Sequence, residues 1–297
     1  MSRKSARSIV ISVRLDETTL AAVDLLVNAG LAQSRSEAAS QFIAIGVQSS
    51  EALLLKAKAL EEHVRRLKNE MLDAVRSKNL EKVKLLLEID EKLKNAKADN
   101  GQTAVLLSAY YRANEIKELL LQQGAELNLH EAAAVGHTAR LREILGREPQ
   151  LVNTHHFDGH TPLGLAAYFG HEEAAAYLLD SGADVNLRGR DGNLDNMPLH
   201  AAIAGNHIGI VRLLLRAGAD VNARCEGEWR RGFTPLHVAA HFNRAEIAKL
   251  LIEHGADPAA ANSEGLTPYE YAVSRGHTEI AKILQDAANR GKEKEIP

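Results

Sequence analysis

The sequence predicts a mainly α-helical protein, in which a short strand, two helices and a helical linker precede an array of about seven helical repeats. Similar phrases such as "TPLH" and "GADVN" recur from about residue 69 to the end of the 297-residue chain. Hydrophobic residues make up 45% of the chain and aromatic residues only 4%, which suits helices rich in Ala and Leu. Residues 9–15 alternate in hydrophobicity as a strand does. We therefore expect three parts: residues 1–48, a linker at 49–68, and the array at 69–297.

The repeat is clearest in four copies, which begin at Thr161, Met197, Thr234 and Thr267. One of them reads "TPLHVAAHFNRAEIAKLLIEHGAD": a cap, a short helix of small residues, a turn, a Leu-rich helix and a Gly stop. Thr caps the first helix, Pro occupies a position whose N–H is not needed, and Gly tolerates the left-handed helix end. This pattern resembles the ankyrin repeat. Fainter copies start at residues 69, 103 and 129, which gives seven.

The resemblance to ankyrin repeats implies a concave helical face and a row of finger-like turns that bind a protein partner. It does not imply catalysis, and we expect neither an enzyme nor a cofactor. His200 and His237 of the "TPLH" phrases are expected to form hydrogen bonds within their repeats. His155, His156 and His160 predict a polar turn rather than a metal site, because no acid or Cys matches them.

Aromatic residues gather at the two positions that follow "AA" in the repeats, which face the concave groove in this family. Five of the twelve aromatic residues in the chain lie there, together with one His. Aromatic side chains stacked along one ridge are typical of an interface. The alternative is that they only cover the repeat beneath them. The predicted contact residues are Tyr110, Tyr111, Tyr168, Phe169, His241 and Phe242.

Two neighbouring fingers, the turns that join one repeat to the next, are longer than the others. The usual spacing from the Asn of "VN" to the next start signal is seven residues, but it is ten after Asn186 and eleven after Asn222. Trp and Arg, which are favoured interface residues, are concentrated in both. A solvated turn is the alternative. The residues of this second predicted contact are Arg188, Arg190, Arg224, Trp229, Arg230 and Arg231.

The strand at residues 9–15 has no partner strand nearby in the sequence. A lone strand would leave its backbone groups unpaired, so we expect it to pair with the same strand of a second copy of the chain. Its alternation separates two faces. Ile9, Ile11, Val13 and Leu15 lie on one face, and Val10, Ser12 and Arg14 on the other.

Two helices are predicted to follow the strand. One, in "DETTLAAVDLLVNAGL", closes at Gly30, and the other starts at Ser34 with Glu37 three residues later, the spacing of a capping box. A strand and two helices within about forty residues, with "SRSEA" opening the second helix, resemble the ribbon-helix-helix fold of the Arc and MetJ repressors. The resemblance covers residues 8–48.

That resemblance implies a homodimer whose two-stranded ribbon enters the major groove of double-stranded DNA. Val10, Ser12 and Arg14 would contact base edges, while Ile11, Val13 and Leu15 would face the helices of the dimer. Ser34, Arg35 and Ser36 would present backbone N–H groups to a phosphate. Arg3, Lys4 and Arg7 would form a basic arm that adds salt-sensitive attraction. A ribbon used only for dimerisation is the alternative.

The linker has an apolar residue at heptad spacing over about three heptads. It predicts either a short parallel coiled coil that extends the dimer or a helix that packs on the first repeat. The residues of this seam are Leu53, Ala57, Leu60, Val64, Leu67, Met71 and Ala74.

Composition limits the location and the partners. The net charge of −3 excludes a protein that is basic over its whole surface, and the single cysteine, Cys225, excludes an internal disulfide and fits a reducing compartment. No apolar run is long enough to span a bilayer. We expect a cytoplasmic bacterial or phage protein, nucleoid-associated when bound to DNA.

Three functions stay open. The first is a dimeric transcriptional regulator, a repressor, that binds operator DNA and whose repeats bind an unidentified protein. The second is an antitoxin whose repeats neutralise a toxin. The third is a dimeric protein-interaction adaptor that does not bind DNA.

Overall fold

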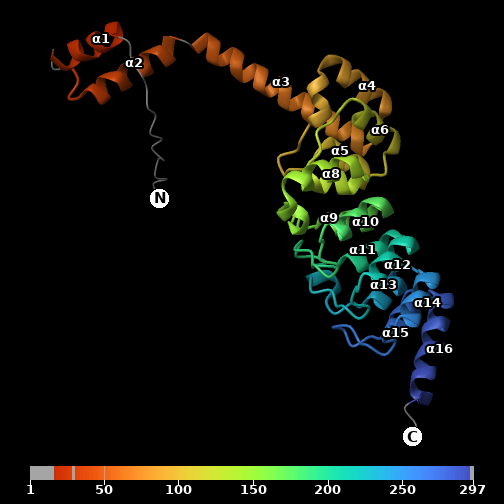
Figure 1. Ribbon diagram of the computed structural model, residues 1–297. Coiled ribbons are helices and arrows are strands. Elements are labelled where there is room, and N and C mark those ends of the chain that lie inside the picture. The colour runs from red at the N-terminus through yellow and green to blue at the C-terminus, as the bar shows by residue number, and fades with distance from the viewer. Residues whose placement is uncertain (1–16, 29–30, 50, 295–297) are drawn as a thin grey trace. The chain divides into compact units, whose positions relative to one another are not determined.

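The computed structural model describes residues 17–28, 31–49 and 51–294, and this part of the chain is helical (Figure 1). It contains no β-strand, only an isolated bridge between Lys97 and Thr103. The chain divides into two compact units, Met1–Arg66 and Leu67–Pro297. The predicted strand and the basic arm lie outside the described residues, and so do the roles assigned there to Arg3, Lys4, Arg7, Val10, Ile11, Ser12, Val13, Arg14 and Leu15.

The first unit contains the two helices that the sequence predicts after the strand, α1 (Glu17–Asn28) and α2 (Arg35–Ser49). The Ser34 hydroxyl oxygen accepts a hydrogen bond from the Glu37 backbone N–H at 3.2 Å, as predicted for the cap of α2. The Glu37 carboxylate accepts from the backbone N–H of Gln33, at 2.6 Å, rather than from that of Ser34. The predicted cap is therefore present, with its second bond moved by one residue.

The contact between α1 and α2 is small. Among the described residues, Val23, Ala32 and Ala38 form its buried apolar cluster, with Leu26, Val27 and Ala39 packed against it. Asp24 of α1 and Arg35 of α2 form a two-point ion pair, with N–O distances of 2.5 and 2.7 Å. The described part of this hairpin therefore buries little apolar surface.

The linker and the first helix of the array form one helix, α3 (Glu51–Arg76), which contains the division between the units. Its last turns belong to the core of the repeats, where Met71 and Ala74 are fully buried and Leu67 is partly buried. These side chains pack against the repeats, as in the second of the two alternatives given for the seam. Ala57 and Leu60, earlier in the seam, are exposed.

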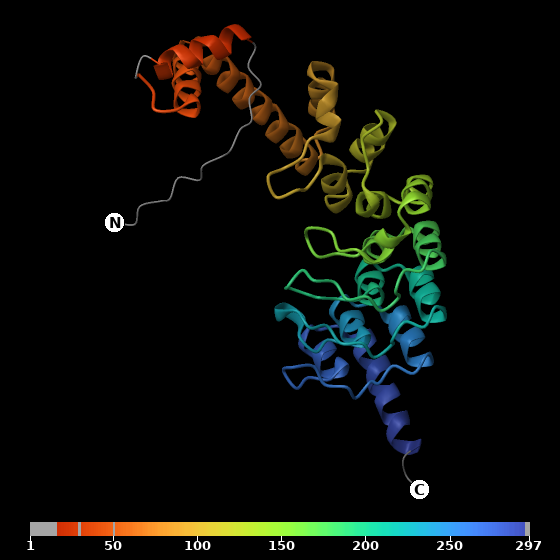
Figure 2. The same ribbon diagram turned by 60° about the vertical axis from the view of Figure 1, so that its left-hand side comes forward.

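The second unit stacks seven helix pairs, the number that the sequence predicts, into a solenoid (Figures 1 and 2). Figure 2 shows the fingers projecting from one side of the stack. Short 3-10 helices occur at η1 (Glu91–Asn95), η2 (Pro149–Asn153) and η3 (Glu228–Arg230). The pairs are α3 with α4 (Leu80–Ile89), α5 (Ala104–Tyr110) with α6 (Asn114–Gln122), α7 (Leu129–Val135) with α8 (Thr138–Arg147), α9 (Pro162–Phe169) with α10 (Glu172–Asp180), α11 (Pro198–Gly205) with α12 (Ile208–Arg216), α13 (Pro235–His241) with α14 (Ala245–Glu253), and α15 (Pro268–Ser274) with α16 (Thr278–Lys294).

Local sequence explains how each pair starts and stops. The Thr161 hydroxyl oxygen accepts from the Gly164 N–H at 3.0 Å, and Pro162 is the first residue of α9. Gly182 of "GADVN" has a φ of 88°, the left-handed conformation that the phrase predicts. The starts and stops of the helices are thus set by residues within each motif.

Hydrogen bonds from side chains join each repeat to the next. The Asn186 amide nitrogen donates to the Gly218 carbonyl at 3.2 Å, and its oxygen accepts from the Asp220 N–H at 2.9 Å. The same pair of bonds recurs from Asn153 and from Asn222. A ladder of Asn side chains therefore runs along the second half of the stack.

The "TPLH" histidines behave as predicted and extend their contacts further. His200 Nδ1 accepts from the Met197 N–H at 3.3 Å within the repeat, and its Nε2 contacts the Ala223 carbonyl at 3.2 Å in the following finger. His237 makes the matching contacts to Thr234 and Leu266. Burial lowers the pKa of His200 to about 4. These neutral rings are structural elements of the repeat.

Of the described helices, none has both the length and the apolar composition to cross a bilayer.

Candidate functional site

Three of the predicted concave aromatic residues form one ring cluster. The Phe169 ring lies 5.1 Å from the Tyr110 ring and 5.1 Å from the Tyr168 ring, both edge to face. Tyr110 belongs to the second repeat and Phe169 to the fourth. The third repeat has the small residues Ala134 and Val135 at the same positions, so rings two repeats apart can meet.

A second ring cluster lies further along the array. The His241 ring lies 4.7 Å from the Phe242 ring and 5.9 Å from the Tyr271 ring, and Phe233 packs 4.9 Å from Tyr271. Tyr271 and Phe233 are not among the predicted site residues, because neither follows "AA" in its repeat. Tyr111, the remaining predicted aromatic residue, is exposed and belongs to neither cluster.

The two long fingers lie against each other, as their length predicts. The Gly227 N–H donates to the Leu194 carbonyl at 3.2 Å, and the Trp229 N–H donates to the Asn193 carbonyl at 2.9 Å. A Cβ atom at Gly227 would lie 2.3 Å from the Asn193 carbonyl oxygen, so this approach requires glycine. The fingers therefore form one wall at the edge of the concave face.

The predicted arginines of these fingers divide into two groups. Arg188 is occupied inside the wall, where its guanidinium donates to the Asp195 carbonyl at 3.1 Å and pairs with Glu226 at 3.1 Å. Arg224 likewise donates to the Ala261 carbonyl at 2.7 Å. Arg190 and Arg231 are exposed, and the Trp229 side chain is 74% exposed.

A pocket of about 300 Å³ lies between the two ring clusters and the wall. Tyr168 and Phe242 line it on the helical face, and Leu194 and Arg230 line it from the two long fingers. The fifth repeat, which lies between the clusters, lines the pocket with His200, Ala201 and Ala204, and has the small Ala204 where neighbouring repeats have rings. The space beside Ala204 thus connects the concave aromatic residues with the long fingers, two features that the sequence predicts separately.

Arg230 is the cation of this pocket. Its Nη2 donates to His241 Nε2 at 3.1 Å, and its guanidinium carbon lies 5.1 Å from the centre of the Phe242 ring. Because Arg has only donors, Nε2 of His241 is the acceptor, and the proton of the neutral ring is on Nδ1, 2.9 Å from the Tyr271 hydroxyl. Burial, and secondly the Arg230 charge, lowers the pKa of His241 to about 4. The ring therefore stays neutral and orients the guanidinium.

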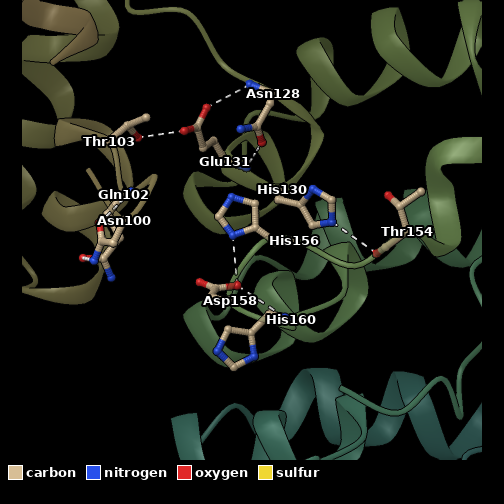
Figure 3. Close-up of polar contacts among 10 residues, drawn as sticks. All are labelled: Asn100, Gln102, Thr103, Asn128, His130, Glu131, Thr154, His156, Asp158 and His160. Carbon is tan, nitrogen blue, oxygen red and sulfur yellow. Dashed lines mark hydrogen bonds and ion pairs between the residues drawn. The ribbon is translucent and has the colours of Figure 1, made fainter. Parts of the chain in front are cut away.

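The His-rich finger is a polar turn (Figure 3). His156 Nδ1 lies 2.9 Å from the Asp158 carboxylate, and the His130 ring packs 5.0 Å from the His156 ring. His155 Nε2 contacts the Arg188 carbonyl at 2.8 Å, and the His160 backbone N–H donates to Asp158 at 3.3 Å. Over the ranges that the structure covers, no three His, Cys, Asp or Glu side chains are arranged to hold a metal ion.

Glu131 occupies the "TPLH" histidine position in the third repeat. Its buried carboxylate accepts from the Thr103 hydroxyl at 2.7 Å and from the Asn128 N–H at 2.9 Å, as Figure 3 shows. A carboxylate here replaces the imidazole and joins the second and third repeats.

The predicted phosphate-binding residues of the first unit, Ser34, Arg35 and Ser36, are all exposed at the start of α2. The Arg35 side chain is held by Asp24, which also raises the pKa of the guanidinium through their hydrogen bond. Large apolar side chains of the same hairpin are exposed as well, among them Leu25, Phe42 and Ile43.

Comparison with known proteins identifies the array. The family model described as "Ankyrin repeats (3 copies)" matches residues 129–225 and 222–295, which together exceed half of the chain. The Neurogenic locus Notch protein of Drosophila melanogaster is 40% identical over 85 residues, 28% of this chain and 3% of its own length. A putative ankyrin repeat protein of Rickettsia felis is 43% identical over 68 residues, 23% of this chain and 29% of its own length. Rabankyrin-5 of Homo sapiens is 40% identical over 78 residues, 26% of this chain and 6% of its own length.

The chain spans less than a third of each of these relatives, and the matched family residues begin at residue 129, after the first unit. The likeness therefore concerns the repeats alone. On the length of the family match, this chain belongs to the ankyrin-repeat family.

Proposed function

We propose that this protein is a protein-interaction molecule whose repeats bind a partner protein across what we call the partner surface. It consists of the two ring clusters and the exposed part of the long-finger wall. The single observation that supports this most strongly is that both predicted contact regions border the same pocket. The residues of the partner surface are Tyr110, Tyr168, Phe169, Arg190, Trp229, Arg230, Arg231, His241, Phe242 and Tyr271.

The side chains of the partner surface fit an interface. Tyr168 is 41% exposed beside the pocket, and Trp229 is the most exposed large apolar side chain of the described residues. Tyr, Trp and Arg carry much of the binding energy in protein interfaces. Arg190 and Arg231 add positive charge at the rim, so we expect acidic residues in the facing part of the partner. This assignment is to binding and not to catalysis.

Affinity capture from the native host, followed by identification of co-purifying proteins, tests this function. A Tyr168→Ala variant should weaken capture of the identified partner by more than about 2 kcal/mol, the level of an interface hot spot. Leu85→Ala is the matched control, because it removes an exposed apolar side chain from α4, away from the partner surface. Equal capture by both variants would place the contact elsewhere.

A second candidate function is that of a dimeric DNA-binding regulator. The observation that favours it is the α1–α2 hairpin, which matches the predicted helices and leaves large apolar side chains exposed around a core of three residues. A second copy of the hairpin would cover these side chains. The base-contacting role of Val10, Ser12 and Arg14 is carried over from the ribbon-helix-helix resemblance.

DNA binding by the full-length chain to its own promoter region tests the second candidate. At about 0.1 M salt, Arg14→Ala should reduce sequence-specific binding, whereas Arg35→Ala should change it less because the Arg35 side chain is paired with Asp24. A wild-type chain that binds specific and random DNA equally would exclude the regulator and leave the adaptor.

A further inference from the structure

The pocket between the ring clusters contains a guanidinium with no carboxylate partner. Among the described residues, the Arg230 guanidinium forms no ion pair, and it contacts neutral His241 and the Phe242 ring. A guanidinium has five N–H donors, and the bond to His241 uses only one of them. Partial burial lowers the pKa of Arg230, which indicates that its charge has lost water.

Asp191 is the carboxylate of the lining, and one of its two oxygens holds a turn of the backbone. Asp191 Oδ1 accepts backbone hydrogen bonds from Asn193, Leu194 and Asp195, at 3.2, 2.9 and 2.7 Å. These bonds hold the turn of the first long finger. Asp191 therefore shapes the pocket, and within the described part of the chain it forms no ion pair with Arg230.

Much of the rest of the lining is apolar, although Thr161, Asn196 and the imidazoles of His160 and His200 also belong to it. The rings of Tyr168 and Phe242 and the side chains of Leu165, Ala204 and Val238 contribute to it. Its volume, about 300 Å³, is at the lower end of the range for pockets that hold small molecules. A few polar groups on an apolar lining are also typical of such pockets.

We propose that this pocket binds a small apolar carboxylic acid as its anion, with the carboxylate on the Arg230 guanidinium and the apolar group between Tyr168 and Phe242, above Ala204. One guanidinium matches one carboxylate in charge and in geometry. A phosphate ester carries more charge and needs more donors than this apolar lining supplies. The inference goes beyond partner binding, because it requires only the pocket.

Isothermal titration of the full-length chain at pH 7 tests the inference, with phenylacetate, 3-phenylpropionate and 4-methylpentanoate as probes. Each acid is compared with its primary amide, which has the same shape without the charge. We expect at least one acid to bind at least about tenfold more tightly than its amide, because hydrogen bonds between charged groups are the stronger ones. Arg230→Gln should abolish this preference.

Two further variants separate the site from its surroundings. Arg231→Gln is the matched control, because it removes the same charge from the neighbouring exposed residue, which does not line this pocket. Ala204→Leu keeps the Arg230 charge and fills the pocket. It should therefore weaken binding of the carboxylic acid by at least about tenfold if the apolar group of the acid lies beside Ala204. Far-ultraviolet circular dichroism and urea unfolding check that each variant is folded.

Several results would overturn the inference. They are the absence of binding by all three acids, equal affinity for each acid and its amide, and an equal loss of affinity for the acid in Arg230→Gln and Arg231→Gln. Binding of only a peptide that ends in Phe with a free carboxylate, and of none of the small acids, would assign the pocket to a partner chain instead. Partner capture by Arg230→Gln is measured in parallel, since lost acid binding with retained capture distinguishes this site from the proposed function.

Discussion

The side-chain oxygen of Asn186 lies 2.9 Å from the backbone nitrogen of Asp220, one repeat further along the chain. The side-chain nitrogen of Asn186 donates to the Gly218 carbonyl beside it. One carboxamide thus satisfies a donor and an acceptor at the end of the following helix pair. Each repeat contacts mainly its neighbours in such a stack, so bonds between repeats contribute directly to its cooperativity.

We predict that Asn186→Ala lowers the free energy of unfolding by about 1 kcal/mol, because it removes two hydrogen bonds to exposed backbone groups, which then bond to water. Urea unfolding followed by circular dichroism measures this. Asn114→Ala is the control, since Asn114 is exposed in the first turn of α6 and its side chain makes no hydrogen bond within the described part of the chain. Equal midpoints for the two variants would show that the Asn ladder contributes little.

The stability of the repeats should fall as the pH falls from about 6.5 towards 4. Burial lowers the pKa of His200 and of His130 to about 4, from the ordinary value of 6.5. A base with a lower pKa in the folded state binds fewer protons there than in the unfolded state, so acid favours unfolding. For His200 alone, the full difference corresponds to about 3 kcal/mol.

Urea unfolding at several pH values measures this dependence. His200→Gln should be less stable than the wild type at pH 7, because it loses the bonds to Met197 and Ala223, but its stability should fall less steeply with acid. The two curves should therefore converge below pH 6.5. His63→Gln, which removes a His at an exposed position of α3, is the control. If the free energy of unfolding fell with pH equally in His200→Gln and in the wild type, this would contradict the role assigned to burial of His200.

The helices were predictable wherever a local motif defines both ends, as from Thr161 to Gly182. There the cap, the proline and the left-handed glycine act within a few residues, so no distant contact is needed. The packing of the last turns of α3 was not predictable from the sequence. An apolar seam at heptad spacing occurs both in a coiled coil and in a helix that packs on a repeat. Only the burial of Met71 and Ala74 decides between them.

The candidate site was predictable only in parts. The aromatic positions and the long fingers are visible in the sequence, but the pocket depends on Ala204 leaving space between rings of other repeats. Tyr271 joins its cluster through His241, a contact across 30 positions that no local pattern contains. The internal role of Arg188 was likewise hidden, because composition alone does not distinguish it from exposed Arg190.

The indole of Trp229 should report directly on partner binding. It is the only Trp in the chain and 74% exposed, so the fluorescence of the free protein should be that of an indole in water. Capture of the partner should shift the emission to shorter wavelengths as the ring loses water. Trp229→Ala should weaken capture while changing the free energy of unfolding by less than about 0.5 kcal/mol, as is usual for a surface position. An unchanged emission spectrum on capture would remove Trp229 from the partner surface.

The exposed apolar side chains of the first unit lead to a prediction about stoichiometry. Phe42 is 40% exposed and Ile43 is 53% exposed, next to a cluster of only three buried residues. A second copy of the hairpin could cover these side chains. Their burial would contribute up to about 1.5–3 kcal/mol each to the free energy of dimerisation. We therefore expect the full-length chain to be a dimer whose apparent stability rises with protein concentration.

Light scattering coupled to size-exclusion chromatography measures the mass. Ile43→Asp should convert the dimer to a monomer, because a carboxylate buried at the contact would lose its water without gaining a partner. Leu85→Asp, which places the same charge at an exposed apolar position of α4, should leave the dimer intact. If the wild type were monomeric at every concentration, the hairpin would have no second copy. The strand expected at residues 9–15 would then lack the partner that its backbone requires.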